Sequence, residues 1–164
     1  MEPGLIELRD GRVLQLIRTQ LGQIMKAYSS DGGLTWTQPE PLGVAAPESP
    51  STIARIPTTG DLVLFYNPDV DLSLSHCGPR CPLTVAISGD EAMTWERTID
   101  LETDCTFSYA YLSCTFHEGR ALLTYGVGGV PIPDSRPGAS KKLVSLPIPA
   151  LYRDERHIGK GARP

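Results

Sequence analysis

A small set of side chains in this sequence has the chemistry to hold an acidic sugar and to attack it. Arg18 and Arg80 carry guanidinium groups, which bind carboxylates through planar, paired hydrogen bonds and stay charged at every working pH. Tyr109 and Tyr111 carry phenol groups, and a phenol avoids the repulsion that a carboxylate nucleophile would meet beside a substrate carboxylate. A tyrosine hydroxyl is a weak nucleophile at neutral pH and needs a neighbouring base, for which Glu2 is the candidate.

Each of these residues also has an ordinary structural interpretation. An isolated acidic residue such as Glu2 is usually solvated, and Arg18 follows a strand-like alternation, where an arginine commonly forms a surface ion pair. Arg80 lies in a proline-rich stretch that would be exposed, and either tyrosine could be a half-buried strand residue. Their order along the chain is what favours a shared ligand site.

One eight-residue signature occurs twice and predicts the fold that carries these residues. Residues 29–36 read Ser-Ser-Asp-Gly-Gly-Leu-Thr-Trp, and residues 88–95 repeat the pattern Ser-x-Asp-x-Gly-x-Thr-Trp with Ala92 in place of the glycine. Asp and Ser side chains can bond loop amides, glycine allows a positive φ, and tryptophan packs beneath the turn. We therefore expect both copies at hairpin turns, with Trp36 and Trp95 largely buried in equivalent positions. A repeat of this length indicates a stack of similar all-β units, either a propeller or a solenoid.

The signature resembles the Asp box, or BNR repeat, of the sialidases and related propellers, and the candidate residues appear in the order that this family uses. The segment from Glu2 to Arg18 resembles the sialidase segment that begins with the catalytic glutamate and ends with the second of three arginines that clamp the substrate carboxylate. Arg80, just before the strand into the second box, lies where the family places its third arginine. The tyrosines lie in a stretch that resembles the family's Tyr-Ser-x-Leu segment. Tyr109 falls on the nucleophile, and Tyr111 is the nearby alternative because a shift of two residues keeps the same face of a strand.

The resemblance implies the C-terminal part of a retaining exo-sialidase, which removes terminal sialic acid from glycans and uses no metal or other cofactor. In the family, the aspartate acid/base and the first clamp arginine come before the part of the fold seen here, so we expect the chain alone to be inactive. Arg55-Ile56-Pro57 resembles the first-arginine motif only superficially, and we interpret Arg55 as a hairpin residue. Two alternatives remain: a non-catalytic Asp-box module that binds glycans or protein, and a propeller glycosidase for another acidic sugar.

Short apolar runs that flank turn signals such as Asp10-Gly11 predict consecutive antiparallel hairpins, and no stretch shows a sustained helix pattern. The expected strands are residues 5–8, 13–17, 24–28, 52–56, 62–66, 83–87, 112–116 and 121–125. Residues 39–50 and 67–82 are expected to be long loops, where sites tend to be built on a rigid scaffold. We assign residues 1–127 to sialidase-like propeller blades and residues 128–164 to a Pro/Gly-rich segment with a polar tail.

The length of 164 residues corresponds to about three blades of roughly 40–50 residues, whereas closed rings have about four to eight blades. An incomplete ring leaves sheet faces and edges open. We therefore expect the chain to need the missing N-terminal blades or to self-associate.

Composition and charge narrow the range of partners. The net charge of −4 and the lack of a basic patch interleaved with aromatic residues argue against nucleic acid. No apolar run approaches the roughly 18 residues of a membrane span, and the first residues show no cationic leader or apolar signal region, so the sequence assigns no compartment. The four cysteines lack zinc-site spacing. Buried free thiols are the favoured interpretation, with a Cys77–Cys81 bridge as the alternative in an oxidising compartment.

Overall fold

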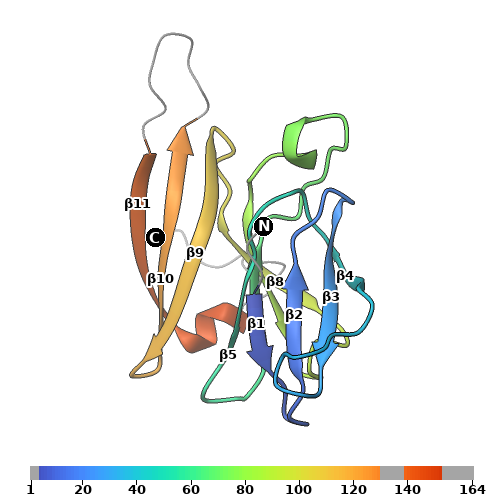
Figure 1. Cartoon of the computed structure of the whole chain (residues 1–164). Helices are drawn as coiled ribbons and strands as arrows, with labels where there is room; N and C mark the ends of the chain where they lie inside the picture. The colour runs from blue at the N-terminus through green and yellow to red at the C-terminus, as the bar shows by residue number, and fades with distance from the viewer. Residues whose placement is uncertain (1–3, 130–138, 153–164) are drawn as a thin grey trace.

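A computed structural model describes residues 4–129 and 139–152, and in them the chain forms three antiparallel β-sheets (Figure 1). The first sheet contains, in order, β1 (Gly4–Glu7), β2 (Val13–Ile17), β3 (Gln23–Ser29) and β4 (Glu40–Ala45). The second contains β5 (Thr52–Arg55), β6 (Leu62–Tyr66), β7 (Leu83–Ser88) and β8 (Glu96–Glu102). The third contains β9 (Phe107–His117), β10 (Arg120–Gly129) and β11 (Ala139–Pro147). Two short 3₁₀ helices are η1 (Ser75–Cys77) and η2 (Ile148–Tyr152).

The predicted all-β architecture of about three blades is confirmed. Within each sheet the strands follow one another in chain order, so every sheet is a run of hairpins. β5 contacts both β1 and β9, so the first strands of the three sheets lie together. This is the arrangement of inner strands around a propeller axis. Among the described residues only η1 and η2 are helical, and neither has the length and apolarity to cross a bilayer.

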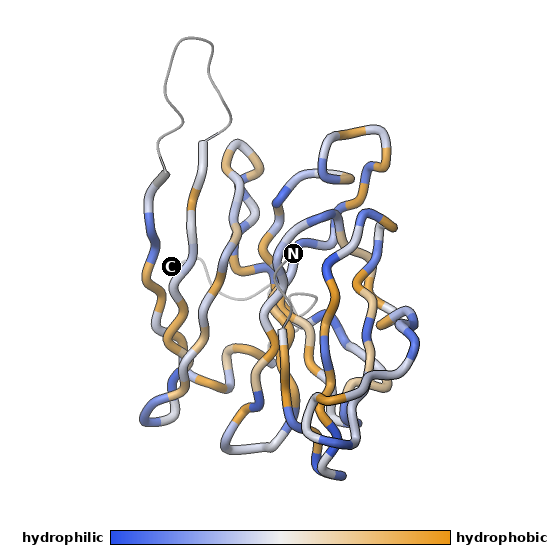
Figure 2. The backbone as a smooth tube through the Cα atoms, viewed as in Figure 1, coloured by the Kyte–Doolittle hydropathy of each residue, from blue (hydrophilic) through white to orange (hydrophobic). Residues whose placement is uncertain are grey.

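Apolar side chains fill the two spaces between the sheets. Leu14, Leu16 and Leu64 belong to a cluster between the first and second sheets, and Phe65 and Leu123 belong to one between the second and third. All of β6 is buried, because the second sheet has a neighbour on both faces. Figure 2 shows apolar stretches along the middle of the strands and hydrophilic residues at many of the turns. Removal of this apolar surface from water is the main driving force for stacking the sheets.

The first Asp box forms the turn between β3 and β4 through hydrogen bonds of its own side chains. The Ser29 hydroxyl accepts from the Gly33 amide at 2.8 Å, and the Asp31 carboxylate accepts from the Thr35 amide at 2.9 Å. The Thr35 hydroxyl also donates to Asp31, at 2.6 Å. The bonds that Asp31 accepts, that of the Thr35 hydroxyl first and then that of the Thr35 amide, lower its pKa to about 2.

The second Asp box, between β7 and β8, keeps the same geometry without its glycine. The Ser88 hydroxyl accepts from the Ala92 amide at 2.9 Å, and Asp90 accepts from the Thr94 amide at 2.9 Å. Ala92 adopts a φ of 67°, close to the glycine conformation of the first box, where φ is 93° at Gly33. The alanine therefore changes the local cost of the turn and leaves its hydrogen bonds in place.

The prediction that both box tryptophans are largely buried is wrong, because both are half-buried. Trp95 packs against the cluster between the first and second sheets, whereas the Trp36 indole donates to the Gly33 carbonyl at 3.1 Å. The second box faces the first sheet. Among the described residues no sheet lies on the other side of the first box to cover Trp36.

Three observed strands are missing from the predicted set, and β9 and β10 are longer than predicted. β4 lies within residues 39–50, expected to be a loop, because Pro41 and Gly43 mask the alternation of buried Leu42 and Val44. β8 is a polar strand at the edge of the second sheet. β11 pairs with β10 over its whole length, so the third sheet extends past the boundary drawn at residue 127.

The prediction of free thiols is wrong for two of the four cysteines. Cys81 and Cys105 form a disulfide, with their Cα atoms 5.4 Å apart, between residues 67–82 and the turn that precedes β9. The alternative Cys77–Cys81 bridge is also excluded, because Cys77 is a free, half-buried thiol. Cys114 is free as well, and burial raises its pKa to about 11.

Arg55 joins the first and second sheets, in addition to its predicted place in a hairpin. Its guanidinium pairs with Glu91 at 2.7 Å and donates to the Glu7 carbonyl at 2.8 Å. Glu91 also accepts from the Arg9 amide at 2.8 Å. The hydrogen bond from Arg55 is the largest of the effects that lower the pKa of Glu91 below its usual value of 4.5.

Glu91→Gln should flatten the acid side of the protein's stability curve. The folded-state pKa of Glu91 is lowered, so its stabilising contribution is present above the unfolded value of 4.5 and is lost as the pH falls through the folded value. In urea unfolding, the free energy of unfolding should fall less between about pH 6 and about pH 3 for this variant than for wild type. The exposed Glu96→Gln serves as the control and should behave as wild type. An unchanged loss in Glu91→Gln would contradict this role.

Candidate active site

The described candidate residues lie at one end of the sheets. Arg18 directly follows β2, Arg80 lies near the end of the 67–82 loop just before β7, and both tyrosines belong to the first half of β9. This end is at the top of Figure 1, where the loop with η1 and the start of β9 are visible. Glu2 lies outside the described residues.

Tyr109 is a core residue. Only 3% of its surface is exposed, its hydroxyl donates to the Asp104 carbonyl at 3.1 Å, and its ring meets Tyr125 edge-on at 6.4 Å between centroids. Burial raises the pKa of Tyr109, and the nearby carboxylates of Glu102 and Asp104 raise it further. A phenol in this position is shielded from a ligand and resists ionisation.

Tyr111 points the other way because β9 contains a β-bulge. The pairing of β9 with β10 shifts between Thr124 and Gly126, so that Tyr111 and Leu112 together oppose the single residue Tyr125. Tyr111 takes a left-handed φ of 58° and is 52% exposed. The expectation that residues two apart share a face is therefore wrong at this point of the strand.

Arg80 lies beside the exposed tyrosine. The Cζ atom of its guanidinium is 5.6 Å from the centre of the Tyr111 ring, within the range of a cation–π contact. An open pocket of about 320 Å³ adjoins both residues, and a second of about 310 Å³ lies next to Tyr111. Lys141 lines both pockets. Arg80 and Lys141 therefore both border the open space next to Tyr111.

Arg18 is held by Glu48, with 3.7 Å between its Nη2 and the Glu48 Oε1, and only 10% of its side chain is exposed. Glu48 also accepts from Gln20 Nε2 at 2.8 Å and lies 3.0 Å from His76 Nδ1. The hydrogen bond from Gln20, followed by that with His76, lowers the pKa of Glu48. His76 belongs to the same loop as Arg80, so Glu48 links Arg18 to that loop.

Sequence reasoning missed a cluster of a tyrosine, a glutamate and a lysine at this end. The Tyr125 hydroxyl donates to Glu102 at the end of β8, and Lys142 of β11 pairs with the same carboxylate. Burial, then the bond to Glu102, raises the pKa of Tyr125, and only 1% of the residue is exposed. Both partners come from strands that were not predicted. Tyr125 lines the pocket of about 310 Å³ next to Tyr111, but the residue is almost fully buried and its phenol is bonded to Glu102.

The described residues contain no group of three or more His, Cys, Asp or Glu side chains placed to hold a metal ion.

Residues 1–121 match the BNR repeat-like domain family. The chain belongs to this family. The predicted resemblance to the sialidase and BNR-repeat proteins is confirmed for the family and the fold. No curated protein sequence matches this domain.

Solved structures place this BNR repeat-like domain among sialidase-like propellers. The intramolecular trans-sialidase of a leech has a TM-score of 0.66 at 17% identity, with 92% of this chain and 24% of that one covered. The intramolecular trans-sialidase of Ruminococcus gnavus also has a TM-score of 0.66, at 18% identity, with 92% and 33% covered. An α-L-arabinofuranosidase of Fusarium graminearum has a TM-score of 0.60 at 17% identity, with 93% and 48% covered. The domain thus spans less than half the length of these enzymes.

Proposed function

We propose that this domain is part of a retaining exo-sialidase, in which Tyr111 is the nucleophile and Arg80 and Arg18 hold the substrate carboxylate. The observation that carries the proposal is the Arg80 guanidinium 5.6 Å from the ring of an exposed tyrosine on an inner strand. Since the domain covers less than half of the similar enzymes, activity would require the blades that complete the ring.

The choice of Tyr111 over Tyr109 rests on access. A nucleophile must approach the anomeric carbon to within about 3–3.5 Å, which the core position of Tyr109 prevents. The bulge that displaces Tyr111 from the regular strand costs backbone energy, and such costs collect at functional sites.

In the proposed reaction the phenol oxygen of Tyr111 bonds to the anomeric carbon while the glycan oxygen leaves. Glu2 takes the phenol proton, and an acid from another blade protonates the leaving oxygen. The same acid, now a base, takes a proton from a water molecule, which attacks the anomeric carbon from the face that the glycan left. The tyrosine oxygen leaves and recovers its proton from Glu2, and the two inversions give retention of configuration. Arg80 and Arg18 fix the carboxylate on that carbon, so the reacting atoms stay aligned.

The similar structures include acidic and neutral sugar ligands. The leech enzyme was complexed with 2,7-anhydro-Neu5Ac and the Fusarium enzyme with arabinobiose. For this domain we favour the acidic class, because Arg80 and Lys141 both line the pocket beside Tyr111.

Arg80→Ala should weaken binding of an acidic substrate selectively. In an enzyme that joins this domain to the remaining blades, we expect the KM for an aryl sialoside to rise about tenfold to a hundredfold, since hydrogen bonds to a charged group are lost. Steady-state kinetics with Arg120→Ala, at the far end of β10, gives the control. An aryl arabinofuranoside should be a poor substrate for both variants. Efficient cleavage of the arabinofuranoside, with no effect of Arg80→Ala, would assign the domain to a neutral sugar instead.

A further inference from the structure

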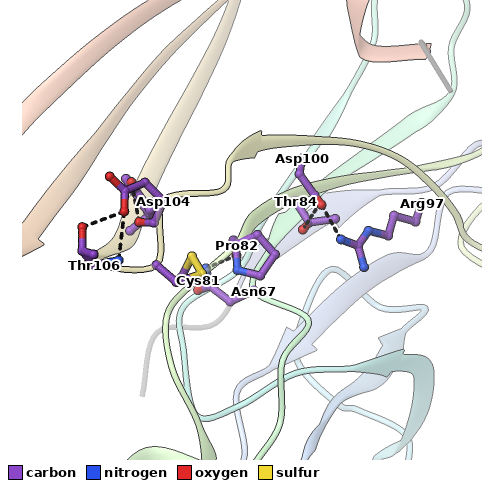
Figure 3. Close-up of a disulfide and its surroundings, with 10 residues drawn as sticks. Asn67, Cys81, Pro82, Thr84, Arg97, Asp100, Asp104 and Thr106 are labelled. Carbon is purple, nitrogen blue, oxygen red and sulfur yellow. Dashed lines mark hydrogen bonds and ion pairs between the residues drawn. A yellow bond between two sulfur atoms is a disulfide. The ribbon is translucent and has the colours of Figure 1, made fainter. Parts of the chain in front are cut away.

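The disulfide holds the residue next to Arg80. Cys81 is 1% exposed and is bonded to Cys105, which lies in the turn between β8 and β9. On the same side, the buried Asn67 side chain donates to the Pro82 carbonyl at 2.8 Å. Figure 3 shows these groups around the disulfide. The last residues of the 67–82 loop are therefore anchored, whereas residues 71–76 are exposed.

The other end of the disulfide lies in a turn that is closed by hydrogen bonds of its own. Asp104 accepts from the Thr106 amide at 3.1 Å and from the Thr106 hydroxyl at 2.6 Å, as Figure 3 shows. The turn leads into β9, where the Tyr109 amide donates to the Arg80 carbonyl at 2.8 Å. Arg80 is thus connected to the strand of Tyr111 by one covalent and one hydrogen-bonded link.

We propose that the Cys81–Cys105 disulfide positions Arg80 beside Tyr111, so that the oxidised protein binds a carboxylate ligand more tightly than the reduced protein. This inference rests on the proposed function of Arg80. Cys81 and Cys105 are positioning residues, because they act through the arginine and not on the ligand. Without the covalent link, the end of an exposed loop and its long arginine side chain must be ordered when the ligand binds, and this ordering weakens binding.

The link can be broken chemically, because Cys105 is exposed to solvent. A dithiol reductant gives two electrons and two protons to the disulfide, which becomes two thiols, while the reductant closes into its own cyclic disulfide. The Cys81–Cys105 disulfide would be stable in an oxidising compartment and would open where thiols are kept reduced. Carboxylate binding at this end of the domain would follow the redox conditions.

The test uses the 164-residue chain in its oxidised form, after dithiothreitol, and as the Cys81→Ser/Cys105→Ser variant. Nuclear magnetic resonance follows the Arg80 side-chain N–H, whose shift reports the nearby Tyr111 ring without any ligand. Titration with the α-methyl glycoside of N-acetylneuraminic acid then gives the dissociation constant. Cys114→Ser, a half-buried free cysteine of β9, is the matched control.

We expect reduction and the double variant to remove the ring shift of Arg80 and to weaken sialoside binding about twofold to tenfold. In an Arg80→Ala background the disulfide should make no further difference to binding, which a purely structural role would not predict. An unchanged Arg80 shift after reduction of the folded chain would overturn the inference, even if the double variant fails to fold. Loss of the shift, with no sialoside binding by any form even when the domain is joined to the remaining blades, would overturn the proposed ligand and leave the positioning role standing.

Discussion

Tyr111→Phe should abolish glycoside hydrolysis, lowering kcat by about a thousandfold or more, in an enzyme that joins this domain to the remaining blades. The substitution removes only the hydroxyl, and with it the covalent step. Tyr111 is 52% exposed, so the loss should not come from unfolding. Initial rates on an aryl sialoside, with circular dichroism as the check on folding, measure the effect.

Tyr109→Phe is the matched control two residues away. It loses one hydrogen bond, to the Asp104 carbonyl, and should keep kcat within about tenfold of wild type at a stability cost of about 1 kcal/mol. If Tyr109→Phe is inactive and Tyr111→Phe is active, the nucleophile is Tyr109. Full activity of both variants would refute the sialidase assignment of this segment.

Leu123→Ala should destabilise the domain by about 3 kcal/mol, because a fully buried leucine leaves a cavity that the surrounding sheets can only partly close. Leu123 lies in the cluster that packs the second sheet against the third. Leu143 of the neighbouring strand is 72% exposed, and Leu143→Ala should change stability by less than about 0.5 kcal/mol. Denaturant unfolding of the two variants measures both values.

The same pair of variants tests whether the chain self-associates through the third sheet. Leu143 lies on the face that points away from the second sheet, where a further blade would stack. If Leu143→Ala costs as much as Leu123→Ala, another molecule covers this face in solution. A concentration-independent, small effect of Leu143→Ala would mean that the face stays open in the isolated chain.

The hairpins and both Asp boxes could be predicted because their signals are local. Short apolar runs bounded by turn residues predicted β2, β6 and β7 at or within one residue of their observed ends. Each box closes on its own Ser, Asp and Thr side chains, so eight residues carry the whole turn. The sequence did not predict strands that form only because a neighbouring strand pairs with them. β8 is mostly polar and β11 has Ser140, Lys141 and Lys142 near its start, and both form strands because β7 and β10 offer them backbone pairing.

Residue types and their order along the chain predict where the candidate site lies, but not which tyrosine faces the ligand. Arg80 and the tyrosine segment were placed at one end of the blades from their order along the chain. The choice between Tyr109 and Tyr111 depends on a bulge set by the pairing with β10, and no local pattern in residues 107–117 indicates it. The disulfide, Glu48 and Glu102 join segments far apart in sequence, so their contacts come from the packing of whole sheets.

The most direct test of the account is to trap the covalent intermediate. A fluorinated sialosyl fluoride slows both steps of a retaining sialidase and leaves the sugar attached to the nucleophile, where peptide mass spectrometry can locate it. In an enzyme that carries this domain within a complete ring, we expect the label on Tyr111. A label on Tyr109 or Tyr125, or an enzyme that hydrolyses sialosides without ever becoming labelled in this domain, would contradict it.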